Sequence, residues 1–222
     1  MTTGTEPRRA VTLMLKDKRL GFADLARPRS VSGGKPSYGA RLIIEPNDPD
    51  VKAIDVAVEE VAAAKWKDKA PTILGMLVEK DRVAFSRKPY RNKEGETYSS
   101  FEGKFSLGVS APEKKRPSYF DEYNKRLVTQ DILDTGTVAF DPEKMRLVSQ
   151  DVIDSLFYAG ARVHMKVELY PLLLDTGDRI GCAVLGLMFA GHGEAFGGGA
   201  PVASDADFSG LAKQPADAED FL

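Results

Sequence analysis

The sequence VHMKVEL, residues 163–169, contains the clearest β-strand pattern in the chain. Its apolar and polar residues alternate with a period of two, which is typical of a strand with one buried face. A turn signal at residues 175–178, Asp-Thr-Gly-Asp, leads into a mostly apolar stretch over residues 179–190. We therefore predict a β-hairpin here. The preceding residues 127–150 are less regular, and a short helix is expected after Asp141-Pro142.

The upstream sequence adds two strands and a helix. Tyr38–Ile44 is rich in β-branched and aromatic residues, and residues 101–109 alternate between apolar and polar side chains. Between them, Asn47-Asp48-Pro49 is a helix-start signal, because the Asp48 carboxylate can accept free N–H groups of the first turn. The apolar residues that follow share one helical face, which predicts a helix over residues 49–66. The fold is thus expected to be mainly β.

The composition is that of an ordinary globular protein. The chain has 222 residues, 42% of them hydrophobic and 29% charged, which is enough for one sizeable core. No run approaches the roughly 18 apolar residues that a membrane span needs. Arg8 and Arg9 are not followed by an apolar run, so no secretory signal peptide is expected. Cys182 is the only cysteine, which excludes an intrachain disulfide and fits a reducing, cytoplasmic setting.

Charge is divided unevenly along the chain. Residues 196–222 carry five acidic residues against Lys213 alone, whereas residues 1–195 carry 30 basic and 28 acidic residues. The C-terminal stretch is rich in Gly, Ala, Ser and Asp, and it cannot bury enough apolar surface to offset its chain entropy. We predict one domain over residues 1–195 and a flexible acidic tail over residues 196–222. The tail ends in an acidic-aromatic cluster that contains Asp217, Glu219, Asp220, Phe221 and Leu222.

Several short motifs suggest a family through their order and spacing. They are RLGFADL (19–25), GKPSY (34–38), LIIEP (42–46), FYAGARV (157–163) and GEAFGG (193–198). Their arrangement, over most of residues 10–200, resembles the single-stranded DNA-binding proteins of tailed bacteriophages. The resemblance implies an OB-fold core, which we expect to be a five-stranded barrel with long loop insertions. It also implies single-stranded DNA as ligand, and an acidic C-terminal tail that contacts replication proteins such as a polymerase, helicase or primase.

Residues 80–126 contain the side chains that such a ligand requires. They hold twelve Lys or Arg residues against seven acidic ones, and eight of the nineteen aromatic residues. Lys and Arg bind phosphates, and exposed rings stack on bases. Phe85, Phe101 and Phe105 are expected in the core instead. The candidate DNA-binding residues are Arg87, Lys88, Tyr90, Arg91, Lys93, Tyr98, Lys104, Lys114, Lys115, Arg116, Tyr119, Phe120 and Tyr123.

The acidic tail suggests a competitor for the same site. A polyanion tethered to a cationic groove competes with DNA at high effective concentration. Bound DNA would displace the tail and present Phe221 and Leu222 to partner proteins. The alternative is a tail that only increases solubility.

Catalysis has little support in the residues, and neither a catalytic site nor a cofactor is expected. His164 is expected on the polar side of its strand, His192 lacks a partner at ligand spacing, and Cys182 is expected to be buried. No phosphate-binding glycine motif is present. Carboxylates at four positions keep a metal-dependent nuclease open as an alternative; they are Asp48, Asp50, Asp131 and Asp134.

Other nucleic-acid functions share the same composition. A single-strand annealing protein or recombination mediator would also bind single strands, and an RNA-binding OB module would prefer RNA. Weaker binding to duplex DNA is expected, because phosphate contacts do not require a single strand. A homodimer is left open. The reading favoured by the resemblance is sequence-tolerant, non-catalytic coating of single-stranded DNA during phage replication, recombination or repair, in the cytoplasm of the infected bacterium.

Overall fold

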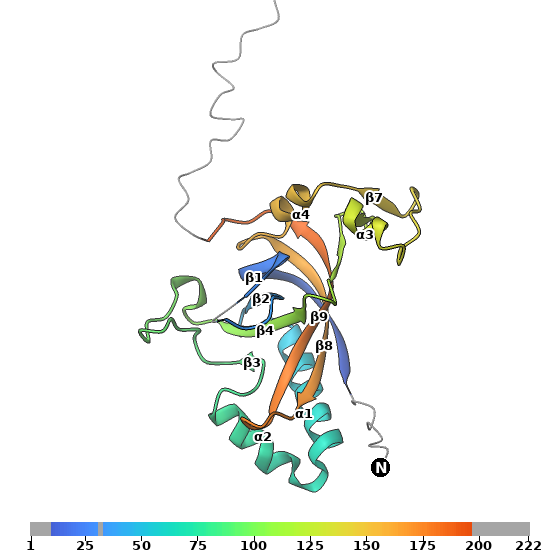
Figure 1. Ribbon diagram of the computed structural model, residues 1–222. Helices are drawn as coiled ribbons and strands as arrows, with labels where there is room; N and C mark the ends of the chain where they lie inside the picture. Colours follow the sequence, from blue (N-terminus) through green and yellow to red (C-terminus); the bar gives the residue numbers. More distant parts are fainter. Residues whose placement is uncertain (1–9, 31–32, 197–222) are drawn as a thin grey trace, which may run out of the picture.

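Five strands form a closed barrel in the computed structural model, which describes residues 10–30 and 33–196 (Figure 1). They are β1 (Val11–Arg29), β2 (Ser37–Ile44), β4 (Phe105–Pro112), β8 (Arg162–Leu172) and β9 (Arg179–Gly191). Antiparallel pairing joins β4 to β2, β2 to β1, β1 to β8 and β8 to β9. A parallel bridge between Ser110 and Ala183 closes the ring between β4 and β9. The expected OB-type barrel is confirmed.

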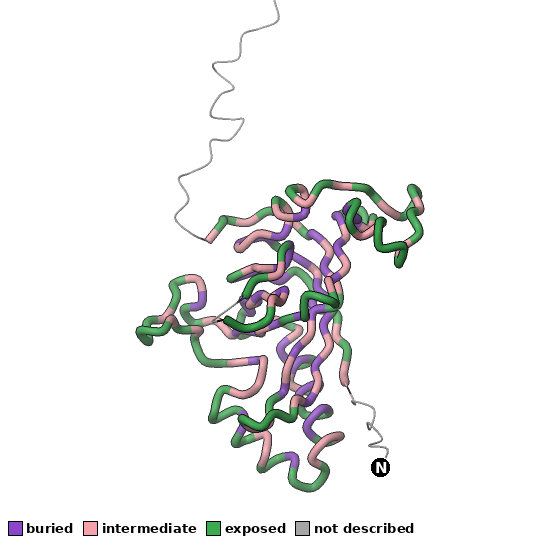
Figure 2. Tube along the Cα trace, viewed as in Figure 1, coloured by how far each residue is buried: buried purple, intermediate pink, exposed green. Residues whose placement is uncertain are grey.

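The core lies inside this barrel, where the inward residues of the strands meet (Figure 2). In β8, all four apolar residues of the VHMKVEL stretch are fully buried, as the period of two predicts. The predicted strand at Tyr38–Ile44 and the predicted hairpin of β8 and β9 are also confirmed. Cys182 is buried as expected, and its burial raises the pKa of the thiol to about 12.

Two helices inserted between β2 and β4 lie together at one end of the barrel (Figure 1). Helix α1 (Asp50–Trp66) confirms the predicted helix, and the Asp48 carboxylate accepts the backbone N–H of Asp50 at 2.9 Å. The 3-10 turn η1 (Lys67–Lys69) connects it to α2 (Ala70–Glu79), which the sequence did not predict. Helix α1 buries Ile54 and Val61 against β1 and β8, and so covers one end of the core.

A small extension follows β4 in the chain and lies on the opposite side of the barrel from α2 (Figure 1). It consists of β5 (Ser118–Phe120), β6 (Arg126–Val128), α3 (Gln130–Asp134), β7 (Met145–Leu147) and α4 (Gln150–Leu156). Strand β5 pairs in parallel with residues 186–188 of β9. The prediction of a helix after Asp141-Pro142 is wrong. The chain forms a turn there instead, in which the Met145 N–H donates to the Asp141 carbonyl at 2.7 Å. The next helix begins only at Gln150.

The predicted strand at residues 101–109 begins later than its alternation suggests. Phe101 lies in a 3-10 turn, η2 (Ser99–Phe101), and Gly103 adopts a φ of +66°, so that β4 starts only at Phe105. The expectation that the three phenylalanines belong to the core holds for Phe101 and Phe85, which are buried, Phe85 in the short strand β3 (Phe85–Ser86). Phe105 is half-buried and packs against the core.

The predicted acidic tail lies outside the described residues, apart from its first residue. The Phe196 N–H donates to the Ala159 carbonyl at 3.0 Å, and its ring lies 4.0 Å from the Arg19 guanidinium. No helix in the described part of the chain is long and apolar enough to cross a membrane.

Candidate nucleic-acid interface

A groove of about 930 Å³ crosses the outer face of β2 and β4 and continues over the first residues of β9. Gly39 and Arg41 of β2 form its floor together with Ser106 and Gly108 of β4. Residues 81–91, which connect α2 to the β3–β4 loop, form one wall. The equivalent face of an OB barrel, on its second and third strands, is the one that binds oligonucleotides.

Positive charge predominates among the charged residues of the groove. Its charged side chains are the cations Arg41, Arg82, Lys88, Arg91 and Arg179 and one carboxylate, Asp81. Asp81 is paired with Lys88 at 2.8 Å. In the described part of the chain, no carboxylate lies within 4.0 Å of any of the four arginines. The groove therefore offers guanidinium groups that are free for an external anion.

Arg41 is the most constrained of these cations. Its guanidinium stacks over the Tyr90 ring at 3.9 Å from the centroid and donates to the Ser106 hydroxyl at 3.1 Å. Burial lowers the pKa of the guanidinium from its ordinary value, although arginine remains charged at neutral pH. A partly desolvated charge without a carboxylate partner favours binding of an anion at this position.

An aromatic cluster lies beside the cations. Phe22 contacts Tyr98 edge-to-face at 4.7 Å between ring centroids and Tyr90 at 5.6 Å, and Phe101 lies nearly parallel to it at 5.9 Å. Tyr90 and Tyr98 are stacked at 5.6 Å. Phe22 and Tyr98 remain 45% and 36% exposed. Exposed rings next to unpaired arginines are the combination that single-stranded nucleic acid requires.

The first predicted loop reaches this groove in part. Lys88, Tyr90 and Arg91 line it, and Tyr98 packs beside it against Phe22. Three candidates of this region do not line the groove. Arg87 is paired with Asp55 and Lys104 with Glu45, while Lys93 is exposed.

The second predicted loop does not line the groove. The prediction that Tyr119 presents an exposed ring is wrong, because this side chain is 1% exposed and its hydroxyl donates to the Leu25 carbonyl at 2.5 Å. Burial raises the pKa of Tyr119 accordingly. Arg116 is held by Asp131 at 3.0 Å and by the Gln150 amide oxygen at 2.6 Å. The other candidates are Lys114 and Lys115, which are exposed, Phe120, which is half-buried, and Tyr123, which is 79% exposed.

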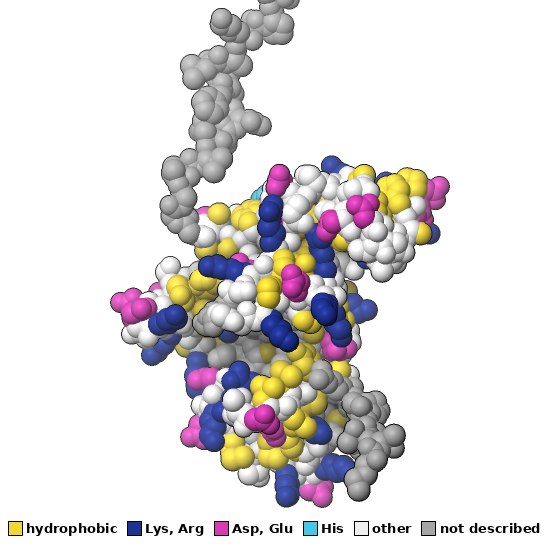
Figure 3. All heavy atoms as spheres, in the orientation of Figure 1, with side chains coloured by type: hydrophobic (Ala, Val, Ile, Leu, Met, Phe, Trp, Pro, Cys, Tyr) yellow, Lys and Arg dark blue, Asp and Glu magenta, His cyan; other side chains and the backbone are white. Residues whose placement is uncertain are grey.

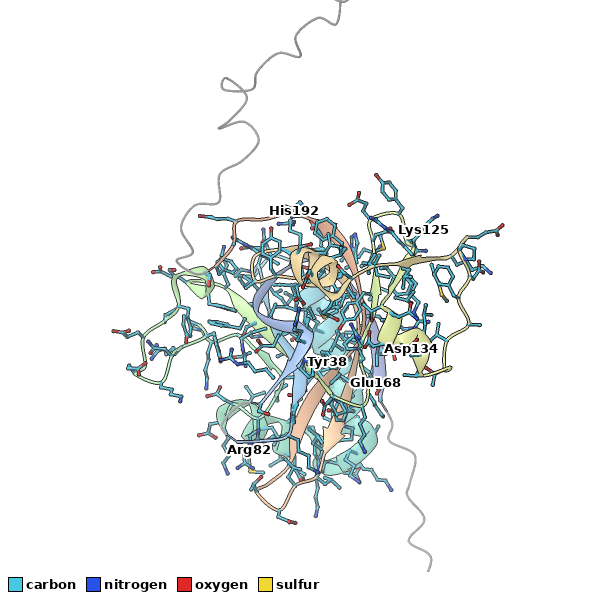
Figure 4. All side chains as sticks on the ribbon, turned by 45° about the horizontal axis from the view of Figure 1, so that its top comes forward. Tyr38, Arg82, Lys125, Asp134, Glu168 and His192 are labelled. Atoms are coloured by element: carbon cyan, nitrogen blue, oxygen red, sulfur yellow. The ribbon has the colours of Figure 1, made fainter. Side chains whose placement is uncertain are left out.

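The groove and the β5–β6 turn lie apart in the molecule. Figure 4 labels Arg82 of the groove and Lys125 of this turn, which lie on opposite sides of the view. Figure 3 shows Lys and Arg side chains spread between hydrophobic ones over the displayed face. Charge alone therefore does not distinguish one face of the molecule, whereas the groove combines arginines that lack a carboxylate partner among the described residues with partly exposed rings.

The carboxylates considered for a metal site have other partners. Asp48 and Asp50 hold the Lys18 ammonium at 2.7 and 2.8 Å, and Asp131 holds Arg116. Asp134 accepts the Gln130 amide at 2.8 Å. Within residues 10–30 and 33–196, no group of three or more His, Cys, Asp or Glu side chains is placed to hold a metal ion.

Each of the two histidines contacts other residues of the fold. His164 is half-buried, and its Nδ1 accepts the backbone N–H of Asp17 at 3.1 Å. His192 lies against the rings of Phe189 and Tyr158, with centroids at 4.9 and 6.1 Å.

Several groove residues escaped the sequence analysis; they are Phe22, Arg41, Arg82, Tyr170 and Arg179. Arg41 carried a usable signal, because it stands between the buried residues Ala40 and Leu42 and so faces outward from a predicted strand. The others come from separate segments, which only the barrel closure brings together.

Comparisons with known proteins agree with this architecture. The family model described as Enterobacter phage Enc34, ssDNA-binding protein, matches residues 11–222. The solved single-stranded DNA-binding protein from bacteriophage Enc34 in complex with ssDNA is 17% identical, with a TM-score of 0.59 over 84% of this chain and 89% of that chain. A second structure of the Enc34 protein is 18% identical, with a TM-score of 0.59 over 88% of this chain and 89% of that one. No match was found among curated proteins. At these identities the structural likeness shows a shared fold.

Proposed function

This chain belongs to the family of the Enterobacter phage Enc34 single-stranded DNA-binding protein, and from that membership we propose that it binds single-stranded DNA through the groove on β2 and β4. The binding is non-catalytic and tolerant of sequence, and it serves phage DNA replication, recombination or repair in the cytoplasm of the infected bacterium. One observation carries the assignment to this groove. Four of its arginines lack a carboxylate partner within the described residues, next to rings that are partly exposed.

The groove supports binding by two kinds of contact. Arg82, Arg91 and Arg179 are available to phosphates, while the rings of the aromatic cluster are available to bases. Neither contact reads base edges, because every base has a π-face and every nucleotide a phosphate. The arrangement therefore favours coating of any single strand over recognition of one sequence.

The test is a salt series with fluorescent oligo-dT and a double variant of the groove, Arg82→Ala with Arg179→Ala. Loss of two phosphate contacts should weaken binding and make the slope of log K against log salt shallower by about 1.4, since each phosphate contributes about 0.7 for a single strand. The matched control is Lys125→Ala with Arg146→Ala, which removes the same charge outside the groove.

The control variant should keep the wild-type slope. Equal losses in the two double variants would show that net charge, and not the groove, sets the affinity. Absence of binding by the wild-type protein at low salt, also after removal of residues 197–222, would exclude the function itself.

The proposal extends to the acidic segment. Residues 196–222 carry five acidic residues against one lysine, and the groove carries unpaired arginines, so the two are complementary in charge. We propose that this segment competes with DNA for the groove, and that displaced residues 217–222 contact replication proteins. The body over residues 1–195 is then the DNA-binding domain, and the segment after it regulates access to the site.

A further inference from the structure

We propose that Phe22 is a base-stacking residue of the groove and that a left-handed backbone conformation presents its ring there. The inference rests on the proposed function, because it assigns one contact within that site. Phe22 lines the groove together with Arg41, so a base on the ring would have a phosphate-binding group nearby.

The backbone at Phe22 is unusual for an aromatic residue. Along β1, Gly21 and Asp24 are three positions apart, whereas their partners on β2, Arg41 and Gly39, are two positions apart. One extra residue therefore bulges out of β1, and Phe22 has a φ of +49°. For a bulky side chain this conformation is an outlier that persists only where the surroundings enforce it, and such residues cluster at binding sites.

The packing under the bulge shows what enforces it. A Cβ on Gly21 would lie 2.8 Å from Cζ of Phe101 and 3.1 Å from the Arg41 carbonyl oxygen. Glycine at position 21 thus allows the Phe101 ring, which is fully buried, to fit directly against the strand. Phe101 then lies nearly parallel to Phe22, at 12° between the ring planes, and supports it from the protein side.

Further contacts fix the ring without covering it. Tyr98 and Tyr90 approach Phe22 at steep angles of 66° and 63°, and 45% of the Phe22 residue stays exposed. A ring that is already held in one orientation loses little conformational freedom when a base stacks on it. A purely structural phenylalanine has no need of an outward bulge, and Phe101 fills the structural role below it.

The experiment compares oligo-dT with an abasic deoxyribose-phosphate strand of equal length at one salt concentration. Phe22→Ala should weaken binding to oligo-dT about 5- to 150-fold, the loss expected for one stacked base, and leave binding to the abasic strand unchanged. Phe22→Gly should do the same while accepting the positive φ without strain, so it separates the ring from the fold. Phe140→Ala is the matched control, because Phe140 is also 45% exposed but does not line the groove.

The outcomes separate the two proposals. Equal losses on both strands, or unchanged affinity for oligo-dT in both Phe22 variants, would overturn base stacking while the proposed function stands. Failure of the wild-type protein to bind either strand would overturn the proposed function and the role of Phe22 with it. A loss confined to oligo-dT, absent in Phe140→Ala, assigns the stack to Phe22.

Discussion

Lys18 places a charged side chain inside the fold at the junction of β1 and α1. It is 3% exposed, and its ammonium group contacts both Asp48 oxygens at 2.9 and 2.7 Å, Asp50 at 2.8 Å and the Lys16 carbonyl at 2.6 Å. The ammonium is therefore fully hydrogen-bonded, which a buried charge requires. Because Asp48 also accepts the first N–H of α1, one cluster of charges joins the helix start to the barrel.

Replacement of Lys18 by methionine should leave two carboxylates together without their cation. We expect a loss of about 3–5 kcal/mol in the free energy of unfolding, the range for breaking a buried ion pair. Urea unfolding measures it, with Lys16→Met as control, because that neighbouring side chain is exposed. A loss no larger than that of the control would show that the cluster adds nothing to stability.

At the scale of elements, the β5–β7 extension is held to the barrel by a few specific contacts. Strand β5 pairs with β9, and the Tyr119 hydroxyl crosses to the Leu25 carbonyl on β1. Arg116, just before β5, connects to Asp131 and to Gln150, whose amide donates to the Ala26 carbonyl at 2.9 Å. Arg116 and Tyr119 thus fix the extension in place, which explains why these two side chains do not reach the groove.

Tyr119→Phe should remove the hydroxyl and leave a buried carbonyl without that donor. The expected loss is about 1–2 kcal/mol in the free energy of unfolding, with affinity for oligo-dT unchanged. Tyr123→Phe, which alters an exposed hydroxyl in the adjacent turn, should change neither quantity. If Tyr119→Phe reduced the affinity for DNA without a loss of stability, Tyr119 would take part in DNA binding after all.

At the scale of the whole molecule, the proposed competition predicts that the charge of one segment acts on the site of another. Deletion of residues 197–222 removes five carboxylates and one lysine. Affinity for oligo-dT should rise at low salt. The gain should vanish at high salt, because salt screens the attraction between the acidic segment and the groove, so that the segment no longer competes there. Replacing the five carboxylates by their amides, with the length kept, should reproduce the gain. Unchanged affinity in both variants would leave the segment without a competing role.

The sequence predicted those elements whose periodicity is unbroken. Strand β8 alternates without interruption, and the α1 face is continuous after Asp48, so both were found. Strand β1 was missed because bulges interrupt its period, with positive φ at Asp17 and Phe22. The residues of the site also fall into those that a local pattern reveals and those that it does not. Lys88, Tyr90 and Arg91 are neighbours in one loop, whereas Arg82 and Arg179 become neighbours only when the barrel closes, which no local pattern encodes.

Strand β9 bridges to β4 at Ala183 and carries β5 at residues 186–188, and it is also the last of the five barrel strands along the chain. A nascent chain cannot close the barrel before β9 has left the ribosome, so the four earlier strands of the barrel cannot form a closed ring until then. A truncated chain without β9 leaves strand edges of β4 and β8 without this partner, and exposed strand edges promote association with other chains. Addition of β9 is therefore the step at which the sheet of this protein becomes a closed barrel.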